Sequence, residues 1–217
     1  MRYDAILLDM DGTVLDTLED LADSMNAALR HFGMPEIRLD QARAYVGNGS
    51  ARFVELSVPG GTPETLRQEI LDWYKPYYDA HCSVKTRPYA GVPELLRALR
   101  AAGLRLCIIS NKPDASVRRL AEEHFSGLLD LAVGESAQLR RKPWPDMIEA
   151  AAARLGLDKS RCLYVGDSEV DVLTARNASI DCASVSWGFR SAGQLREAGA
   201  SVIFDSPEIL RDWILAS

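Results

Sequence analysis

The feature that most restricts the fold is an alternation of short apolar runs with amphipathic segments, which begins after Pro88 and continues to the end of the chain. Short apolar runs bounded by Gly, Pro or charged residues are typical of buried strands, and apolar residues at i, i+3 and i+4 are typical of helices. Strands are expected at residues 3–8, 104–109, 128–133, 161–165, 181–185 and 201–204, and helices at 92–102, 113–124, 145–155, 170–178 and 207–215. This order predicts an α/β fold with a Rossmann-like, doubly wound parallel sheet covered by helices on both faces.

The segment between the first two expected strands has a different character. Residues 18–32 form an amphipathic helical pattern, residues 39–82 read as helices interrupted by glycine-containing turns, and no strand pattern occurs between them. We therefore expect an α/β domain made of residues 1–15 and 84–217, with a small all-helical cap, residues 16–83, inserted after the first strand. Ligands of open α/β sheets bind beyond the carboxyl ends of the strands, so the insertion is expected to act as a lid.

The composition narrows the classes of partner. The 217 residues carry a net charge of -6 and the pI is about 5.2, which disfavours nucleic acid as a partner because that binding requires a basic face. An anionic substrate would need a local cationic site. The four cysteines include no C-x-x-C pair, and we expect them to be reduced thiols. The sequence shows no secretory leader pattern and no long apolar run, so we expect a cytoplasmic location and no membrane partner. The oligomeric state, monomer or homodimer, stays open.

The first chemical motif is Asp9-Met10-Asp11-Gly12-Thr13, directly after the first expected strand. Side chains at i and i+2 of an extended segment point the same way, so the carboxylates of Asp9 and Asp11 would repel each other. A divalent cation relieves this repulsion and makes one carboxylate a nucleophile toward phosphorus. A plain turn is the competing interpretation, since Asp-Gly is common in turns.

Three further motifs follow expected strands or precede expected helices. Ser110-Asn111-Lys112 can hold phosphate oxygens or simply cap a helix. Lys142, in Lys142-Pro143-Trp144-Pro145, can supply a positive charge to a phosphate or lie in solvent. Asp167 and Asp171, in Gly166-Asp167-Ser168-Glu169-Val170-Asp171, can bind a hard cation or stabilise a helix N-terminus. Each signal alone is weak, but all four motifs are expected at one edge of the sheet, which indicates phosphate chemistry with a hard metal ion.

These motifs resemble those of the haloacid dehalogenase superfamily over essentially the whole chain. The resemblance implies that Asp9 attacks phosphorus and forms an aspartyl-phosphate, and that Asp11 protonates the leaving alkoxide and then activates water. It also implies that Ser110, Asn111 and Lys142 hold the phosphoryl group. Dehalogenases of this superfamily lack the acid at the position of Asp11, so dehalogenation is disfavoured.

The same resemblance implies the cofactor. Mg²⁺ is expected on Asp9, the backbone carbonyl of Asp11 and Asp167, with Asp171 nearby or in the outer shell. The chain departs from the superfamily pattern at Ser179, where a glycine is usual, and we expect a mild effect.

Within the superfamily the helical insertion resembles the cap of the phosphoglycolate phosphatase group, as does its loop Val46-Gly47-Asn48-Gly49. The resemblance implies a small phosphorylated metabolite as substrate, with 2-phosphoglycolate the best guess. Gly12 and the cap residues Gly47, Asn48 and Gly49 are expected to contact it, since glycines let backbone amides approach closely. Arg43, Arg52 and Lys112 are candidate cations for its carboxylate, and solvated surface is the favoured interpretation for Arg43 and Arg52 taken individually.

Other functions remain open at this point. A phosphatase of broad specificity, acting on nucleotides, sugar phosphates or pyrophosphate, would have the same catalytic residues, and so would a phosphomutase. A receiver-like signalling module also combines magnesium with an aspartyl-phosphate, but it carries its lysine after its acids, whereas here Lys142 precedes Asp167. A nucleotide-binding fold is disfavoured because the chain has no P-loop and no complete dinucleotide fingerprint.

Overall fold

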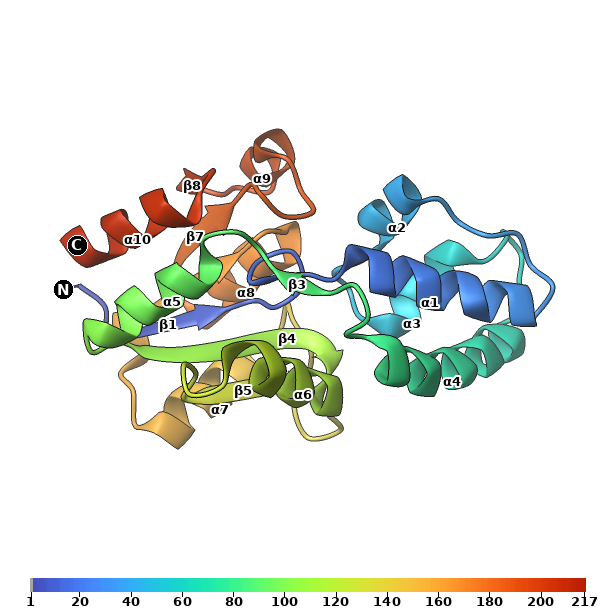
Figure 1. Cartoon of the computed structure of the whole chain (residues 1–217), viewed down its shortest axis with the longest axis horizontal. Helices are drawn as coiled ribbons and strands as arrows, with labels where there is room; N and C mark the ends of the chain where they lie inside the picture. Colours follow the sequence, from blue (N-terminus) through green and yellow to red (C-terminus); the bar gives the residue numbers. More distant parts are fainter. Residues whose placement is uncertain (1) are drawn as a thin grey trace. The chain divides into compact units, whose positions relative to one another are not determined.

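The computed structural model describes residues 2–217, which divide into two compact units (Figure 1). The first unit contains residues 2–15 and 88–217, and the second contains residues 16–87. The chain passes between them twice, where β2 (Leu15–Asp16) pairs with β3 (Arg87–Pro88). None of the helices found in residues 2–217 combines the length and the apolar composition that crossing a bilayer takes.

The first unit is built on a six-stranded sheet in which every neighbouring pair is parallel. Its order is β5-β4-β1-β6-β7-β8. The strands are β1 (Ala5–Leu8), β4 (Arg105–Pro113), β5 (Leu131–Glu135), β6 (Cys162–Gly166), β7 (Asp181–Val185) and β8 (Ile203–Phe204). The central strand β1 pairs with β4 on one side and β6 on the other, in register through Leu8. The segments that follow these three strands therefore emerge side by side at one edge.

Helices cover both faces of this sheet, as the alternating pattern predicts. They are α5 (Val92–Ala101), α6 (Asp114–Phe125), α7 (Asp146–Leu155), α8 (Glu169–Ala178), α9 (Ala192–Glu197) and α10 (Pro207–Ala216), with a short 3-10 turn at Lys159–Arg161. Helices α7 and α8 pack on one face, and α5, α6 and α10 lie on the other (Figure 1).

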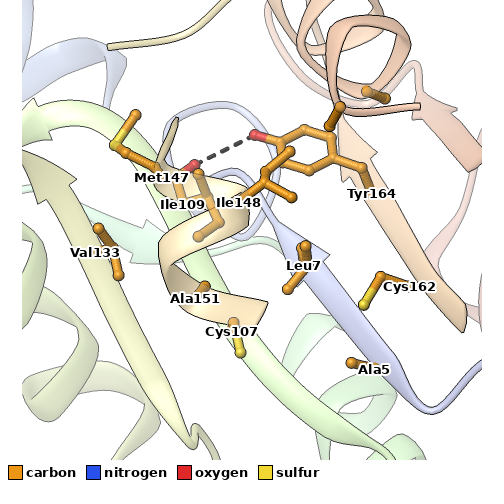
Figure 2. Packing of buried hydrophobic residues seen from close by; sticks show 12 residues of the cluster. Ala5, Leu7, Cys107, Ile109, Val133, Met147, Ile148, Ala151, Cys162 and Tyr164 are labelled. Carbon is orange, nitrogen blue, oxygen red and sulfur yellow. Dashed lines mark hydrogen bonds between the residues drawn. The ribbon is translucent and has the colours of Figure 1, made fainter. Parts of the chain in front are cut away.

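The core under α7 and α8 follows the two-residue period of the strands. Ala5 and Leu7 of β1, Cys107 and Ile109 of β4, and Cys162 and Tyr164 of β6 all point to this face (Figure 2). They are fully buried or nearly so, and all four cysteines of the chain are free thiols. These apolar residues therefore form a closely packed core below the edge of the sheet at which β1, β4 and β6 end.

The second unit is all-helical. It contains α1 (Leu18–His31), α2 (Leu39–Tyr45), α3 (Ser50–Ser57) and α4 (Glu64–His81). The buried carboxylate of Asp20 in α1 accepts hydrogen bonds from the backbone N–H groups of Lys85 and Thr86 at 2.8–3.0 Å. These bonds hold the returning segment against α1, so the second crossing falls after Arg87 rather than at residue 84.

Several elements differ from the expected ranges. Strand β4 continues to Pro113, because its pairing with β5 resumes at Glu135 after an irregularity between Ile109 and Pro113. Strand β5 begins at Leu131 instead of residue 128, because the Leu128 N–H donates to the Phe125 carbonyl in a turn. The short elements β2, β3 and α9 were not expected. Ser179 ends α8 with φ of 58°, which accounts for the glycine usual there.

Candidate active site

The first acid of the site, Asp9, follows β1 and is 7% exposed. Its backbone N–H donates to the Val165 carbonyl of β6 at 2.9 Å, which continues the sheet pairing to this residue. Its Oδ1 accepts from the Met10 N–H at 2.7 Å and lies 2.8 Å from the Lys142 ammonium. Burial raises the pKa of Asp9 to about 7, against the opposing charge of Lys142. The carboxylate is thus fixed by its neighbours and held in a site with little water.

Lys142 is the buried cation of the site. Its ammonium lies 2.8 Å from both Asp9 Oδ1 and Asp171 Oδ1. Burial alone would lower the pKa of Lys142, but the charges of Asp171 and Asp9 outweigh it and raise the pKa. The Asn111 side chain holds the lysine backbone at both polar groups: its Oδ1 accepts from the Lys142 N–H at 2.7 Å, and its Nδ2 donates to the Lys142 carbonyl at 3.1 Å.

Asp167 follows β6 and is 1% exposed. Its Oδ2 accepts from the Phe189 N–H at 2.7 Å, and its Oδ1 accepts from the Thr13 hydroxyl at 3.2 Å. Burial raises the pKa of Asp167 well above its ordinary value, and the charges of Asp171 and Asp9 add to the effect.

Two glycines leave the space that Asp167 occupies. Gly12 has a φ of 82°, and a Cβ there would lie 2.3 Å from Asp167 Oδ2. A Cβ on Gly188 would lie 2.1 Å from the Gly12 carbonyl oxygen and 2.5 Å from the same Asp167 atom. Both positions therefore require glycine, the first for its backbone conformation and both for the close approach.

The acids of this edge fit a divalent cation. Carboxylate oxygens of Asp9, Asp167 and Asp171 all lie within 4.8 Å of one another. When all three acids are ionised, their charges and the single ammonium of Lys142 leave two uncompensated negative charges in a buried volume, which is unfavourable without a counterion. The donors are all oxygens, the ligands preferred by hard cations such as Mg²⁺ or Ca²⁺. The residues present thus match a divalent metal site.

A second acid–lysine pair lies beside the first. The Lys112 ammonium is 3.0 Å from Asp11 Oδ1, and the lysine side chain is 2% exposed whereas that of Asp11 is 20% exposed. The Lys112 N–H donates to the Ser110 hydroxyl at 3.3 Å. Asp11 is therefore the more accessible of the first two acids, and a buried cation sits next to it.

Comparisons with known proteins place this arrangement in a family. The family model of the haloacid dehalogenase-like hydrolases matches residues 6–185. The chain belongs to this family. It is 36% identical to N-acetylmuramic acid 6-phosphate phosphatase of Pseudomonas aeruginosa, over 98% of this chain and 95% of that protein. It is 30% identical to a phosphoglycolate phosphatase of Psychrobacter arcticus, over 99% and 97%.

The fold comparison agrees. A crystal structure from Lactobacillus delbrueckii subsp. bulgaricus, whose assignment as a phosphoglycolate phosphatase is itself a prediction, superposes with a TM-score of 0.95 at 37% identity and covers both chains fully. The chain is thus a phosphatase of the haloacid dehalogenase superfamily, similar to phosphoglycolate phosphatases, and a phosphoric monoester hydrolase. The α/β fold class expected from the sequence is confirmed.

The structure brings most of the expected residues of this hydrolase together in the first unit. Asp9, Lys142, Asp167 and Asp171 form one contact network, and Asp11 and Ser110 each contact Lys112 beside it. Gly47, Asn48 and Gly49 form the turn between α2 and α3 in the helical unit, and their contact with substrate stays a prediction.

The contacts of three residues add detail to their expected roles. The side-chain amide of Asn111 binds the Lys142 backbone, and its expected contact with phosphate stays a prediction. The carboxylate of Asp11 lies outside the acid cluster and pairs with Lys112. Asp171 bonds Lys142 and the Ser168 hydroxyl and N–H, and its expected place near the metal ion or in its outer shell stays a prediction.

Sequence reasoning missed the contacts around Asp167. Phe189 acts through its backbone N–H, which no side-chain pattern reveals, and Gly188 acts through the absence of a Cβ. The available signal was the segment Val185-Ser186-Trp187-Gly188, which is similar to the phosphoglycolate phosphatase group but by itself indicates no role for the glycine.

Replacing Gly188 with alanine is expected to weaken divalent metal binding. The new Cβ must displace the Gly12 backbone or the Asp167 carboxylate. Changes that disturb the orientation of a metal ligand typically cost roughly 10- to 100-fold in affinity, and we expect a loss in that range. Titration with Mn²⁺ followed by its EPR signal measures the change in Kd.

Gly193→Ala is the matched control. A Cβ there would meet nothing closer than Ser191 Oγ at 3.8 Å, so its metal affinity should match that of the unaltered protein. An unchanged Kd in folded Gly188→Ala protein would show that the glycine is not needed to place Asp167.

Proposed function

We propose that this protein hydrolyses a small phosphomonoester through an aspartyl-phosphate on Asp9, with Mg²⁺ as its metal ion. The observation that supports this most directly is the buried network in which Asp9 contacts Lys142 and lies within 4.8 Å of Asp167 and Asp171. Such a network combines an ionised nucleophile, a cation for the phosphoryl oxygens and ligands for a hard metal ion.

The side chains divide the reaction between them. Asp9 supplies the carboxylate oxygen that attacks phosphorus, and Lys142 neutralises charge on the transferring phosphoryl group. The Ser110 hydroxyl, at the edge of the sheet beside Lys112, donates to a phosphoryl oxygen. Asp11 gives its proton to the leaving oxygen and then takes one from the water that hydrolyses the aspartyl-phosphate.

Mg²⁺, when bound, offsets the negative charges of the acids and the phosphoryl group and lets them approach each other. The proposed ligands are Asp9, Asp167 and the backbone carbonyl of Asp11. Asp171 is proposed to support them from nearby or from the outer coordination shell. Asp171 holds Lys142 in place, and the Phe189 N–H and Thr13 hydroxyl orient Asp167.

For the substrate, we propose a phosphomonoester that also carries a carboxylate. 2-Phosphoglycolate is the first candidate, supported by the phosphoglycolate phosphatases among the relatives. N-acetylmuramic acid 6-phosphate is the second, supported by the relative at 36% identity. Both molecules bear a carboxylate, and Lys112 is a buried cation next to Asp11, the acid assigned to the leaving group.

A substrate panel built from matched pairs tests this proposal. 2-Phosphoglycolate is compared with 2-hydroxyethyl phosphate, and N-acetylmuramic acid 6-phosphate with N-acetylglucosamine 6-phosphate, which lacks the lactyl carboxylate. We expect kcat/KM for one carboxylate-bearing substrate to exceed that of its partner without the carboxylate, and that of AMP, pyrophosphate and glucose 6-phosphate, by at least about tenfold, or about 1.4 kcal/mol. Phosphate release in the presence of Mg²⁺ is the measurement.

The other possible results of the substrate panel would indicate different functions. Equal turnover across the panel would indicate a phosphatase of broad specificity and would contradict the carboxylate preference alone. Conversion of a hexose 1-phosphate to its 6-phosphate without phosphate release would indicate a mutase. No turnover of any phosphomonoester would contradict the proposed function as a whole.

A further inference from the structure

A buried phenol lies at the meeting point of three of the catalytic segments. Tyr164 is in β6, is 0% exposed and points into the core beneath the sheet edge (Figure 2). Its hydroxyl oxygen lies 3.1 Å from Lys142 Nζ, 3.1 Å from Asp171 Oδ1 and 3.3 Å from the Ile109 carbonyl oxygen. Ile109 directly precedes Ser110 in β4, so this one hydroxyl touches groups from β4, the Lys142 loop and α8.

The direction of these hydrogen bonds follows from the groups themselves. An ammonium can only donate, so Lys142 donates to the Tyr164 oxygen. The single phenolic proton is then shared between two acceptors, the Asp171 carboxylate and the Ile109 carbonyl. Burial raises the pKa of Tyr164 well above its ordinary value, and the nearby charges of Asp171 and Asp9 add to this, so the phenol keeps its proton.

The hydroxyl also completes the coordination of the lysine. Lys142 has three N–H donors, and its three acceptors are Asp9 Oδ1, Asp171 Oδ1 and the Tyr164 oxygen. With two acceptors, one N–H of the ammonium would have no partner. Three acceptors in three directions engage all three N–H groups and hold the ammonium in place. A buried hydroxyl in an otherwise apolar strand needs such partners, because leaving it unpaired is costly.

We propose that Tyr164 is a positioning residue for Lys142, holding its ammonium against the Asp9 carboxylate. It contacts no substrate itself and acts through the lysine. This inference rests on the proposed function, since it assumes that Lys142 serves the phosphoryl group. The competing role is purely structural, because the Tyr164 ring is also part of the core cluster.

Tyr164→Phe separates the two roles, because it keeps the ring and removes the hydroxyl. We expect kcat to fall roughly tenfold, since small misplacement of a reacting group is costly, while KM changes little and the fold persists by circular dichroism. Binding of inorganic phosphate, measured by calorimetry in the presence of Mg²⁺, should weaken as well. Tyr3→Phe is the matched control: Tyr3 is a buried tyrosine whose hydroxyl donates to the Asp181 carboxylate at 2.9 Å in the same unit.

A double-mutant cycle with Lys142→Met completes the test. If Tyr164 acts through the lysine, Tyr164→Phe causes no further loss of kcat or phosphate affinity in that background. Three results would overturn the proposal: kcat of Tyr164→Phe within twofold of the unaltered enzyme, an equal loss in Tyr3→Phe, or the same fold-loss with and without Lys142. Turnover by the unaltered enzyme reports separately on the proposed function, because the Tyr164 proposal concerns only the ratios between variants.

Discussion

Asp9→Asn is expected to lower kcat by at least about 10⁴-fold, because it removes the proposed nucleophile, on which the aspartyl-phosphate would form. The amide keeps the size of the carboxylate and can still accept from the Met10 N–H, so the fold should persist. Lys142 keeps its contact with Asp171. Turnover of the best substrate at saturating Mg²⁺ measures the loss.

The acid-quenched adduct gives an independent measurement. Mass spectrometry of the unaltered enzyme, quenched during turnover, should find phosphate on the peptide that contains Asp9, and the adduct should be absent from Asp9→Asn. Asp212→Asn is the control, since Asp212 is an exposed acid that pairs only with its neighbour Arg211 in the described structure. Activity within tenfold of normal in Asp9→Asn, or an adduct on another residue, would contradict the assigned nucleophile.

The sequence predicted those helices and strands that carry a clear local pattern of apolar and polar residues. The buried strands β1 and β6 are short apolar runs, and α8 and α10 begin next to polar or proline residues that favour helix starts. The elements that escaped prediction are short or defined by pairing. Strands β2 and β3 have two residues each, and β4 extends through Ser110-Asn111-Lys112 only because Pro113 pairs with Glu135 across the sheet.

The candidate active site was likewise predictable only in part. Asp9, Lys142 and Asp167 could be identified because each carries a charge next to the end of a strand or the start of a helix. Their supporting groups could not, because the support comes from backbone atoms and from partners distant in the sequence. The sequence of Asn111 and its neighbours does not reveal that the Asn111 amide binds the Lys142 backbone. Tyr164 reads as one more apolar strand residue until its hydroxyl is seen beside Lys142.

Removal of the divalent cation is expected to abolish turnover, and added Mg²⁺ should restore it. Without the ion, Asp9, Asp167 and Asp171 keep their mutual repulsion, with only Lys142 to offset it. Ca²⁺ should occupy the same oxygen ligands but support little turnover, because its larger and looser coordination shell misplaces the nucleophile. Phosphate release after dialysis against EDTA, then with each ion added back, is the measurement. Full activity in excess EDTA would remove the metal from the mechanism.

Metal affinity is also expected to fall as the pH is lowered. In the metal-free protein burial raises the pKa of Asp9 to about 7 and that of Asp167 well above its ordinary value. At pH 6 Asp9 is mostly protonated and the incoming ion must displace its proton, whereas at pH 8 Asp9 is mostly ionised. Displacing one proton from Asp9 alone, with its pKa of about 7, makes the apparent affinity for Mg²⁺ about tenfold weaker at pH 6 than at pH 8. Calorimetry in buffers of different ionisation enthalpy measures the affinity and the protons released together. Equal affinity at both pH values without proton release would mean that Asp9 is not a ligand.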